Sequence, residues 1–592
     1  MPKRVTLASA GFLVVCSRHS GQTAWHTPKY IAPSRLPTRI ILEDGLKMLP
    51  HKDIGNIGIF RPSKTCEDIS YSRIKTAVFD KYSPGLYTDK NKIVEIVNFK
   101  YKLYYQVLDE YLPQIDAEGF FTFLCGEYEL YGQVEDLFKN GHLSKREEEF
   151  WQTSAHYARR GIKHLMELLC LADMKSKKDA ALSQQEKAIS MVFIAAEELV
   201  GLYMRSDYYT HIKKEITLRL DNNKYTYFDI AQDQEDKFDI REIMSTNQKI
   251  IPNPNFLLDI DLHDKFLKES FTKKTGTSYK NATQALSWII ENYSDSDNPK
   301  RMGHCLRSEV ISTLAHCFEI PASAAETIID GFSLSADVMR TEGRELFRPK
   351  QQYRAYKRGF FRVSHNNEEL LIFSARMARE CLSLLCADTV FKKIPPEWKT
   401  STIDLALSKL AKAAGNWFED VVKGNLKKLG IEGITSIKKI VFKNGKRIII
   451  PSDVGEIDFL GFCPSQMILV VCEAKQVGFS TEPRMFLDDQ SKFITDSKSH
   501  SKQFEKKIKW SIENREILSA YLSEHFNVEL KLDSIGYAMI THYPMKVASQ
   551  IKQFTCLSLA ELVQHHRAKN LIWDFSRIEY KDLIDVDSPT NT

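Results

Sequence analysis

Apolar residues recur at spacings of three and four over long stretches of the first two thirds of this chain. This periodicity predicts amphipathic helices, because residues three and four positions apart lie on one helical face. The clearest helical stretches are 91–112, 145–172 and 183–204. Residues 1–75 instead show short apolar runs among Gly and Pro residues, as in IGNIGIF, and these runs predict short strands.

Two interruptions of the helical pattern indicate domain boundaries. Residues 221–242 are polar and acidic, and Pro395 with Pro396 cannot continue a helix. A third region between these interruptions is again mostly helical. We therefore expect four parts: a β-containing segment at 1–75, a helical domain at 76–255, a mostly helical domain with a basic strand region at 256–395, and a separate domain at 396–592.

The pattern after Pro396 changes to alternating helices and strands. An amphipathic helix is predicted to end at Gly430, a residue typical of helix C-caps, and two strands flank the hairpin signal Asn444-Gly445. Two apolar strands, GEIDFLGF and MILVVCEAK, are joined by a short turn, and one long helix at 501–526, a strand and a strand–helix unit follow. The fold class that we predict is multi-domain, with a mostly α-helical N-terminal region and a C-terminal α/β domain around a mixed central sheet.

The composition is that of a globular protein and adds little about its partners. Hydrophobic residues make up 43% and charged residues 27% of 592 residues, and the formal net charge of +5 is too small to identify a nucleic-acid partner. No apolar run approaches the ~20 residues of a membrane span. Eleven cysteines without a CxxC pair predict reduced thiols and a cytoplasmic location. Residues 5–16 fit either a first strand or a signal-like segment.

Acidic residues and a lysine gather at the ends of the two apolar strands. Glu456 and Asp458 alternate on the first strand, and Glu473 and Lys475 end the second. A short turn pairs the strands antiparallel, so we expect these side chains on one face. Carboxylates this close would raise each other's pKa, and a hard cation such as Mg²⁺ would relieve the repulsion. The alternative is an exposed set of salt bridges that contributes at most ~1 kcal/mol.

These residues resemble the motif of the PD-(D/E)xK nuclease superfamily, which has the restriction-endonuclease-like fold. The resemblance covers residues 400–565 and rests on GNWFEDVVKGNLKKLG with Glu419, GEIDFLGF with Asp458, and VVCEAKQ with Glu473 and Lys475. It implies that Asp458 and Glu473 bind Mg²⁺ or Mn²⁺. It also implies that Lys475 is the catalytic lysine and Glu419 an outer acid.

The resemblance extends to two neighbouring positions and departs from the motif at one. It implies that the Ala474 carbonyl helps to bind the metal and that Gln476 contacts substrate or water. The proline of the motif is not adjacent to Asp458, because Pro451 instead precedes Asp453 by two positions. Asp453 or Glu456 therefore competes with Asp458 for the metal role.

The function that we expect is Mg²⁺-dependent hydrolysis of phosphodiester bonds in nucleic acid by an endonuclease, with DNA favoured over RNA. The N-terminal region would sense, bind or gate, and a large front end joined to such a nuclease resembles prokaryotic antiviral defence effectors. The alternative is a non-catalytic nucleic-acid-binding or scaffold protein that retains the fold. Further partners would be a second copy or another protein, and not a membrane.

Two basic stretches are candidate phosphate contacts. Residues 347–362 contain Arg354, Lys357 and Arg358 among Phe and Tyr residues and no acid, so we expect them to bind substrate. A solvated basic strand is the alternative. The second stretch lies on the predicted helix after the motif, where a solvated helical face is equally consistent with the pattern. Its lysines are Lys502, Lys506, Lys507 and Lys509.

Overall fold

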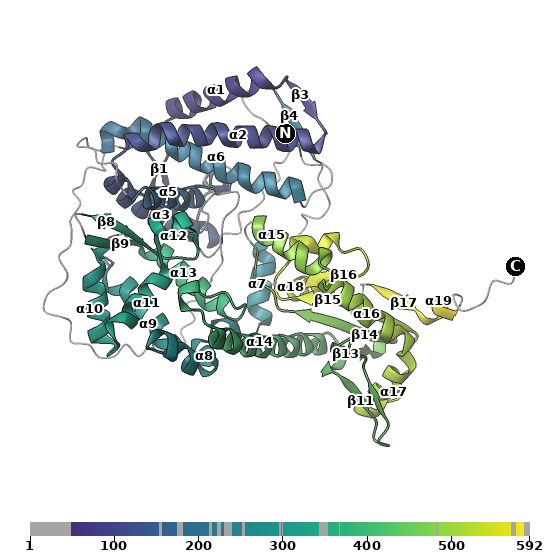
Figure 1. The fold of residues 1–592 in the computed structure, drawn as a ribbon. Coiled ribbons are helices and arrows are strands. Elements are labelled where there is room, and N and C mark those ends of the chain that lie inside the picture. Colours follow the sequence, from purple (N-terminus) through teal and green to yellow (C-terminus); the bar gives the residue numbers. More distant parts are fainter. Residues whose placement is uncertain are drawn as a thin grey trace. The chain divides into compact units, whose positions relative to one another are not determined.

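A computed structural model shows the chain as two compact units, one within 1–232 and 258–407, the other within 233–257 and 408–592 (Figure 1). The residues that the structure describes are 49–152, 157–173, 182–211, 216–221, 227–229, 240–251, 255–294, 298, 300–341, 353–365, 368–480, 483–569 and 576–584. The candidate strand or signal at 5–16 lies outside them. Among the described residues, no helix combines the length and the apolar character needed to cross a bilayer.

The first unit is mostly helical and contains three small sheets. Its helices are α1 (Lys64–Lys81), α2 (Lys90–Tyr111), α3 (Ala117–Lys139), α4 (Lys145–Phe150), α5 (Ala158–Leu171), α6 (Glu186–His211), α8 (Ile260–Thr275), α9 (Tyr279–Asn292), α10 (Arg307–Cys317), α11 (Ala322–Phe332), α12 (Ala336–Thr341) and α13 (Ala375–Thr389). Its strands are β1 (His51–Ile54), β2 (Ile57–Phe60), β3 (Gly85–Tyr87), β4 (Thr217–Leu220), β5 (Tyr227–Asp229), β6 (Met302–Leu306), β7 (Ser333–Ser335), β8 (Phe360–His365) and β9 (Glu368–Ser374). The largest sheet has the order β6-β9-β8-β7.

The helical periodicity of this region is confirmed, and one strand prediction is wrong in part. Helices α2, α5 and α6 overlap the predicted helical stretches, and α6 continues beyond its stretch to His211. The short strands expected in 1–75 end at Phe60, and Ser63 caps a helix that begins at Lys64 by accepting a hydrogen bond from the N–H of Cys66. The predicted β-containing segment therefore includes the start of a long helix, α1.

The second unit is built on a six-stranded mixed sheet with the order β10-β13-β14-β15-β16, in which β17 also pairs with β15. Its strands are β10 (Glu432–Ile437), β11 (Lys439–Val441), β12 (Arg447–Ile449), β13 (Ile457–Cys463), β14 (Ile468–Lys475), β15 (Ser534–Thr541), β16 (Thr555–Ser558) and β17 (Arg577–Glu579). Its helices are α7 (Ile240–Ile250), most of α14 (Ser401–Lys428), α15 (Pro483–Gln490), α16 (His500–Glu513), α17 (Arg515–Phe526), α18 (Leu559–Lys569) and α19 (Tyr580–Ile584). Strands β11 and β12 form a separate hairpin. The predicted α/β organisation with a mixed sheet is confirmed.

Each face of this sheet is covered by its own helices. Apolar residues of α14, α18 and α7 pack on one face, against Phe459, Val470 and Ile540. Apolar residues of α16 and α17 pack on the other, against Leu460 and Val471. Because side chains alternate along a strand, neighbouring residues of β13 and β14 belong to different cores.

The end of α14 and the β13–β14 turn follow from local sequence. Gly430 adopts a left-handed conformation (φ 79°), and the N–H of Ile431 bonds back to the Leu426 carbonyl, which closes the helix. The β13–β14 connection turns at Pro464–Gln466 and Met467 (φ 52°). These two devices set where the strands that carry the motif begin and pair.

Two boundaries differ from the prediction. The division between the units falls within α14, after Leu407, and not at Pro395-Pro396. Helix α7, assigned from sequence to the helical domain, belongs to the second unit, because Ile250 enters its core and Asn425 donates a hydrogen bond to the Ile250 carbonyl (3.2 Å). The predicted long helix at 501–526 is two helices, since Asn514 interrupts it.

Helix α7 should therefore stabilise the second unit. We expect Ile250→Ala to lower the free energy of unfolding of this unit by roughly 2–4 kcal/mol, because it removes buried apolar contacts from the core. Hydrogen exchange of β13–β15 in increasing urea measures this loss. The exposed Gln248→Ala on the same helix is the control. Equal protection in both variants would show that α7 adds nothing to the core.

Candidate active site

Asp458 on β13 and Glu473 on β14 lie opposite each other on the face that α16 covers. The ladder pairs Phe459 with Cys472, and one further step of the same antiparallel register places Asp458 opposite Glu473. The backbone N–H of Ala474 donates to Oδ2 of Asp458 (3.0 Å). The two carboxylates are 6% and 1% exposed, so they lie inside the unit and not on a surface hairpin.

Lys475 joins the same face, as its spacing of two from Glu473 predicts. Its Nζ lies 2.6 Å from Oε1 of Glu473 and 3.4 Å from Oδ2 of Asp458. Burial alone would lower the pKa of Lys475, but these two carboxylates outweigh it and raise the pKa above its usual range. The ammonium is therefore charged at neutral pH.

A second lysine, Lys507 of α16, reaches the two carboxylates from the helix above. Its Nζ lies 2.5 Å from Oε2 of Glu473 and 3.2 Å from Oδ1 of Asp458, and the residue is buried. We call Asp458, Glu473, Lys475 and Lys507 the carboxylate–lysine cluster. Two negative and two positive charges balance within it, as buried charges require.

The prediction that Lys507 belongs to a phosphate-facing surface patch is wrong. Its neighbours Lys502, Lys506 and Lys509 are exposed, whereas Lys507 lies next to Ile508 and three positions after Phe504 on the buried face of α16. The helical spacing from Phe504 is the signal that could have identified it. Proximity in sequence to exposed lysines concealed it.

Glu419 of α14 lies near the cluster without joining its ion pairs. The Ser436 hydroxyl donates to its Oε2 (2.6 Å). Burial raises the pKa of Glu419 to about 7, and the charges of Asp458 and Glu456 act in the same direction. A half-buried acid near a carboxylate pair fits the outer-acid position that the family resemblance implies.

Two further polar groups near the cluster are Gln476 and His500. Among the described residues, neither the Gln476 Nε2 nor the His500 Nδ1 has a hydrogen-bond partner, although both atoms are buried. Burial lowers the pKa of His500 to about 4, with the Lys475 charge acting in the same direction. Sequence reasoning missed His500, which lies one seven-residue helical repeat before Lys507 on α16.

The two competing acids lie outside the cluster's ion pairs. The Glu456 carboxylate pairs with Lys438 (3.3 Å). Asp453 is an exposed turn residue 4.0 Å from Lys506. Of the three candidate acids on this segment, Asp458 alone bonds with Lys475 and Lys507.

The three cations proposed as substrate contacts in 347–362 are interior ion-pair partners, so this prediction is corrected. Residues 347–352 lie outside the described residues. Arg354 and Arg358 are 9% and 1% exposed, and Lys357 is largely covered. Each cation contacts an acid of the first unit: Arg354 pairs with Glu167 (2.8 Å), Lys357 with Asp388 and Arg358 with Glu397 (2.9 Å). Buried, neutralised cations are not available to phosphates.

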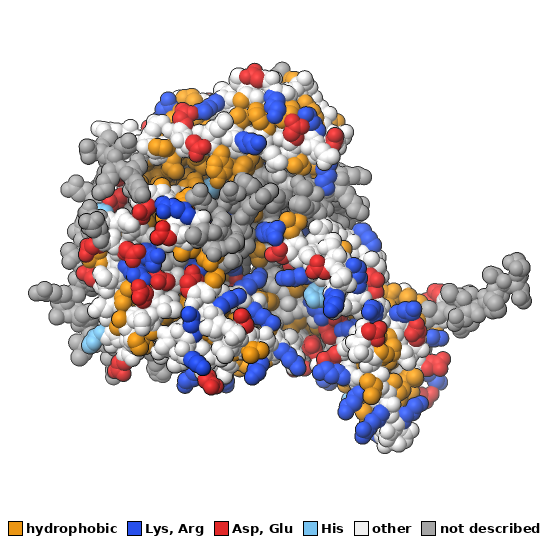
Figure 2. All heavy atoms as spheres, viewed as in Figure 1, with side chains coloured by type: hydrophobic (Ala, Val, Ile, Leu, Met, Phe, Trp, Pro, Cys, Tyr) orange, Lys and Arg blue, Asp and Glu red, His pale blue; other side chains and the backbone are white. Residues whose placement is uncertain are grey.

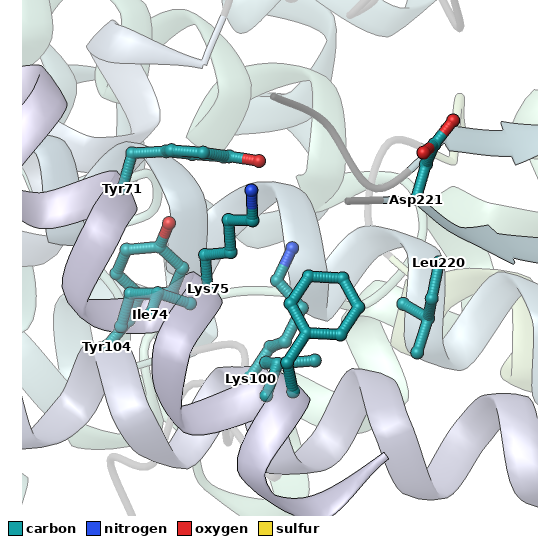
Figure 3. Close-up of a pocket in the computed structure, with 9 residues that line it drawn as sticks. Tyr71, Ile74, Lys75, Lys100, Tyr104, Leu220 and Asp221 are labelled. Carbon is teal, nitrogen blue, oxygen red and sulfur yellow. The ribbon is translucent and has the colours of Figure 1, made fainter. Parts of the chain in front are cut away.

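A small hollow in the first unit is lined by two lysines together with apolar and tyrosine side chains. Lys75 of α1 and Lys100 of α2 extend into it beside Tyr71 and Tyr104 (Figure 3), and burial lowers the pKa of Lys100. The volume open to water is ≈ 30 Å³. Small-molecule sites occupy roughly 300–1,000 Å³, so this hollow is too small for a nucleotide.

Comparisons of the chain with protein-family models, curated proteins and solved structures find no match.

The donor chemistry of the cluster fits a hard divalent cation. Mg²⁺ is typically held by one or two carboxylates, with waters and substrate phosphates completing the shell, and Asp458 with Glu473 supplies such a pair. Within the described residues, no group of three or more acids, histidines or cysteines converges as a metal site. The ammonium of Lys507 contacts both carboxylates, so a cation bound there would have to displace it.

The balance of charge predicts how the cluster responds to losing Lys507. We expect Lys507→Met to lower the free energy of unfolding in EDTA by roughly 3–5 kcal/mol, because it leaves a buried carboxylate without its partner. Urea denaturation measures the change. The matched control is Lys506→Met, which removes an exposed charge from the same helix.

The double variant Glu473→Gln with Lys507→Met should regain most of that stability, since both members of the pair are neutralised together. A single Lys507→Met variant as stable as the wild type would contradict the assignment of Lys507 to the cluster.

Proposed function

We propose that the second unit is a metal-dependent phosphodiesterase of the PD-(D/E)xK type, with a restriction-endonuclease-like fold. Its proposed substrate is nucleic acid, with DNA favoured over RNA. The observation that carries the proposal is the placement of Asp458 opposite Glu473 on adjacent antiparallel strands, with Lys475 on the same face. A mixed sheet with helices on both faces and Glu419 on the helix before it supports the proposal. The N-terminal unit would sense, bind or gate.

The acids and the lysine of the site would have different roles in this reaction. Asp458 and Glu473 would hold Mg²⁺ or Mn²⁺, with the Ala474 carbonyl as an added donor. When bound, the cation polarises a phosphate oxygen and lowers the pKa of a water molecule. Lys475, which the carboxylates keep protonated, faces the same space and would stabilise negative charge that develops on the phosphate. Gln476 and Glu419 would orient substrate or water.

Lys507 adds a condition to this scheme. Its ammonium neutralises both carboxylates in the absence of a cation, so it keeps the buried acids compatible with the fold. Release of Lys507 from Asp458 and Glu473 would accompany cation binding. Lys507 lies on α16, which packs directly on the sheet, so movement of that helix would control access to the acids.

The same lysine supports a second candidate function. A cluster that is already charge-balanced without a metal is what a non-catalytic nucleic-acid-binding or scaffold protein on this fold would contain. Incubation of the purified chain with plasmid, linear duplex, single-stranded DNA and RNA, each with Mg²⁺ or EDTA, separates the two functions. Cleavage that requires the metal supports the nuclease, and binding without cleavage of any substrate supports the alternative.

The carboxylates should be indispensable to cleavage. Asp458→Asn and Glu473→Gln each remove one negative ligand, so we expect Mg²⁺-dependent cleavage to fall to the background rate while the circular dichroism spectrum is unchanged. Glu529→Gln is the control, because this acid is exposed on the same unit. Cleavage that persists in both site variants and still responds to EDTA would disprove the site.

Lys475 should affect the chemical step rather than the metal. We expect Lys475→Ala to slow single-turnover cleavage on the order of 10²-fold or more, as does the loss of other groups that stabilise developing charge. The affinity for Mn²⁺, measured by calorimetry, should remain close to the wild-type value. A wild-type single-turnover rate in the Lys475→Ala variant would show that Lys475 is only an ion-pair partner of the carboxylates.

A further inference from the structure

The β11–β12 hairpin concentrates exposed positive charge outside the carboxylate–lysine cluster. Residues 438–447 contain five cations and no acid: Lys438, Lys439, Lys443, Lys446 and Arg447. All five are exposed. Figure 1 shows the hairpin extending from the second unit, and Figure 2 shows Lys and Arg side chains gathered at that end.

The outer face of the hairpin combines cations with exposed aliphatic side chains. The ladder pairs Lys439 with Ile449 and Val441 with Arg447, and opposite or alternate residues share one face, so these four lie together. Ile449 is 77% exposed and Val441 40%. None of these four side chains is buried, so this face does not contribute to the hydrophobic core.

The inner face fixes the hairpin in place. Ile440 is fully buried in the core under α17. The Phe442 ring meets the Tyr521 ring edge-on at 5.9 Å, and the backbone N–H of Lys443 donates to the Glu524 carboxylate. A partner that binds the outer face would therefore meet a preformed surface and would lose little affinity to ordering it.

Among the described residues, most of the hairpin's cations form no ion pair, although the Glu524 carboxylate accepts a hydrogen bond from the backbone N–H of Lys443. Lys438 pairs with Glu456. In the described part of the chain, no carboxylate lies within ion-pair distance of Lys439, Lys443, Lys446 or Arg447. Four cations on one rigid projection are a site for a polyanion, since each can neutralise one phosphate.

The hairpin is also joined directly to the candidate site. It lies in the sequence between β10 and β13, and β13 carries Asp458 as its second residue. The Lys438–Glu456 ion pair ties the base of the hairpin to the residue two positions before Asp458. Because the last residue of β10, Ile437, pairs with Ile457, the base of the hairpin lies at the end of β13 that carries Asp458.

We propose that the β11–β12 hairpin is a ribbon that binds duplex DNA and presents its backbone to the carboxylate–lysine cluster. This inference rests on the proposed function. A two-stranded ribbon fits the major groove, where cations reach the flanking phosphates and aliphatic groups meet thymine methyls. Single strands are usually bound by stacking on aromatic rings. The outer face has no aromatic residue, because Phe442 faces Tyr521, and this favours a duplex.

The test neutralises the four cations in the full chain as K439Q/K443Q/K446Q/R447Q. Binding to a fluorescent 30-base-pair duplex is measured by anisotropy in EDTA at several salt concentrations. We expect the dissociation constant at 100 mM KCl to rise on the order of 10²-fold. The slope of log affinity against log salt should become shallower by about 3 to 4, because four phosphate contacts are lost.

Two further variants make the result specific. K409Q/K428Q/K531Q/K552Q removes the same charge from exposed positions elsewhere on the unit and should leave the slope unchanged. K443Q/K446Q, at the hairpin tip, should give about half of the full change. An unchanged slope in the hairpin variant, or an equal change in the control, overturns the inference. Wild-type binding that favours single-stranded over duplex DNA overturns the choice of a duplex.

The result of this binding test can be distinguished from the result of the cleavage test of the proposed function. Duplex binding that depends on the hairpin, in a chain that never cleaves with Mg²⁺, would retain the inference and reject the nuclease. Metal-dependent cleavage in a chain whose hairpin variant binds normally would do the reverse.

Discussion

The second unit depends on the neutralisation of two carboxylates that its sheet buries. Asp458 and Glu473 are nearly inaccessible to solvent, and an uncompensated buried ion costs several kcal/mol. Lys475 from the same strand and Lys507 from α16 supply the opposite charges. The register of β13 on β14 and the position of α16 on the sheet are therefore linked to one another. A one-residue slip of β13 on β14 would turn Asp458 into the opposite core and separate it from Glu473.

The need to neutralise buried charge also determines the role of the basic stretch of the first unit. There the buried charges are cations, and their pairing makes them unavailable to phosphates. Arg354 and Arg358 are buried, and each is neutralised by an acid from elsewhere in the chain. They hold the first unit together and leave no charge for phosphates. The exposed cations of the β11–β12 hairpin, by contrast, contribute little to the fold. Burial and pairing, more than the local density of Lys and Arg, distinguish cations that stabilise the fold from cations that are accessible to an anion.

The sequence pattern predicted the strands of the site because the features that determine their arrangement are local in sequence. Alternation along β13 and β14 and a short turn determine which side chains share a face, so Asp458, Glu473 and Lys475 were placed correctly. Tertiary pairing is not local: Arg354 bonds with Glu167, 187 positions away, and no pattern near Arg354 reveals it. Helix α7 was misplaced for the same reason, because it covers a sheet that begins far along the chain. Lys507 was missed because exposed lysines surround it in sequence.

The proposed function requires that the buried carboxylate pair binds a divalent cation and that Lys507 withdraws from it. Anomalous diffraction from crystals of the full chain soaked in Mn²⁺ tests it most directly. We expect an anomalous peak between the Asp458 and Glu473 carboxylates, with the Lys507 ammonium displaced from both. Crystals that show no peak at millimolar Mn²⁺, with Lys507 still bonded to both acids, would contradict it.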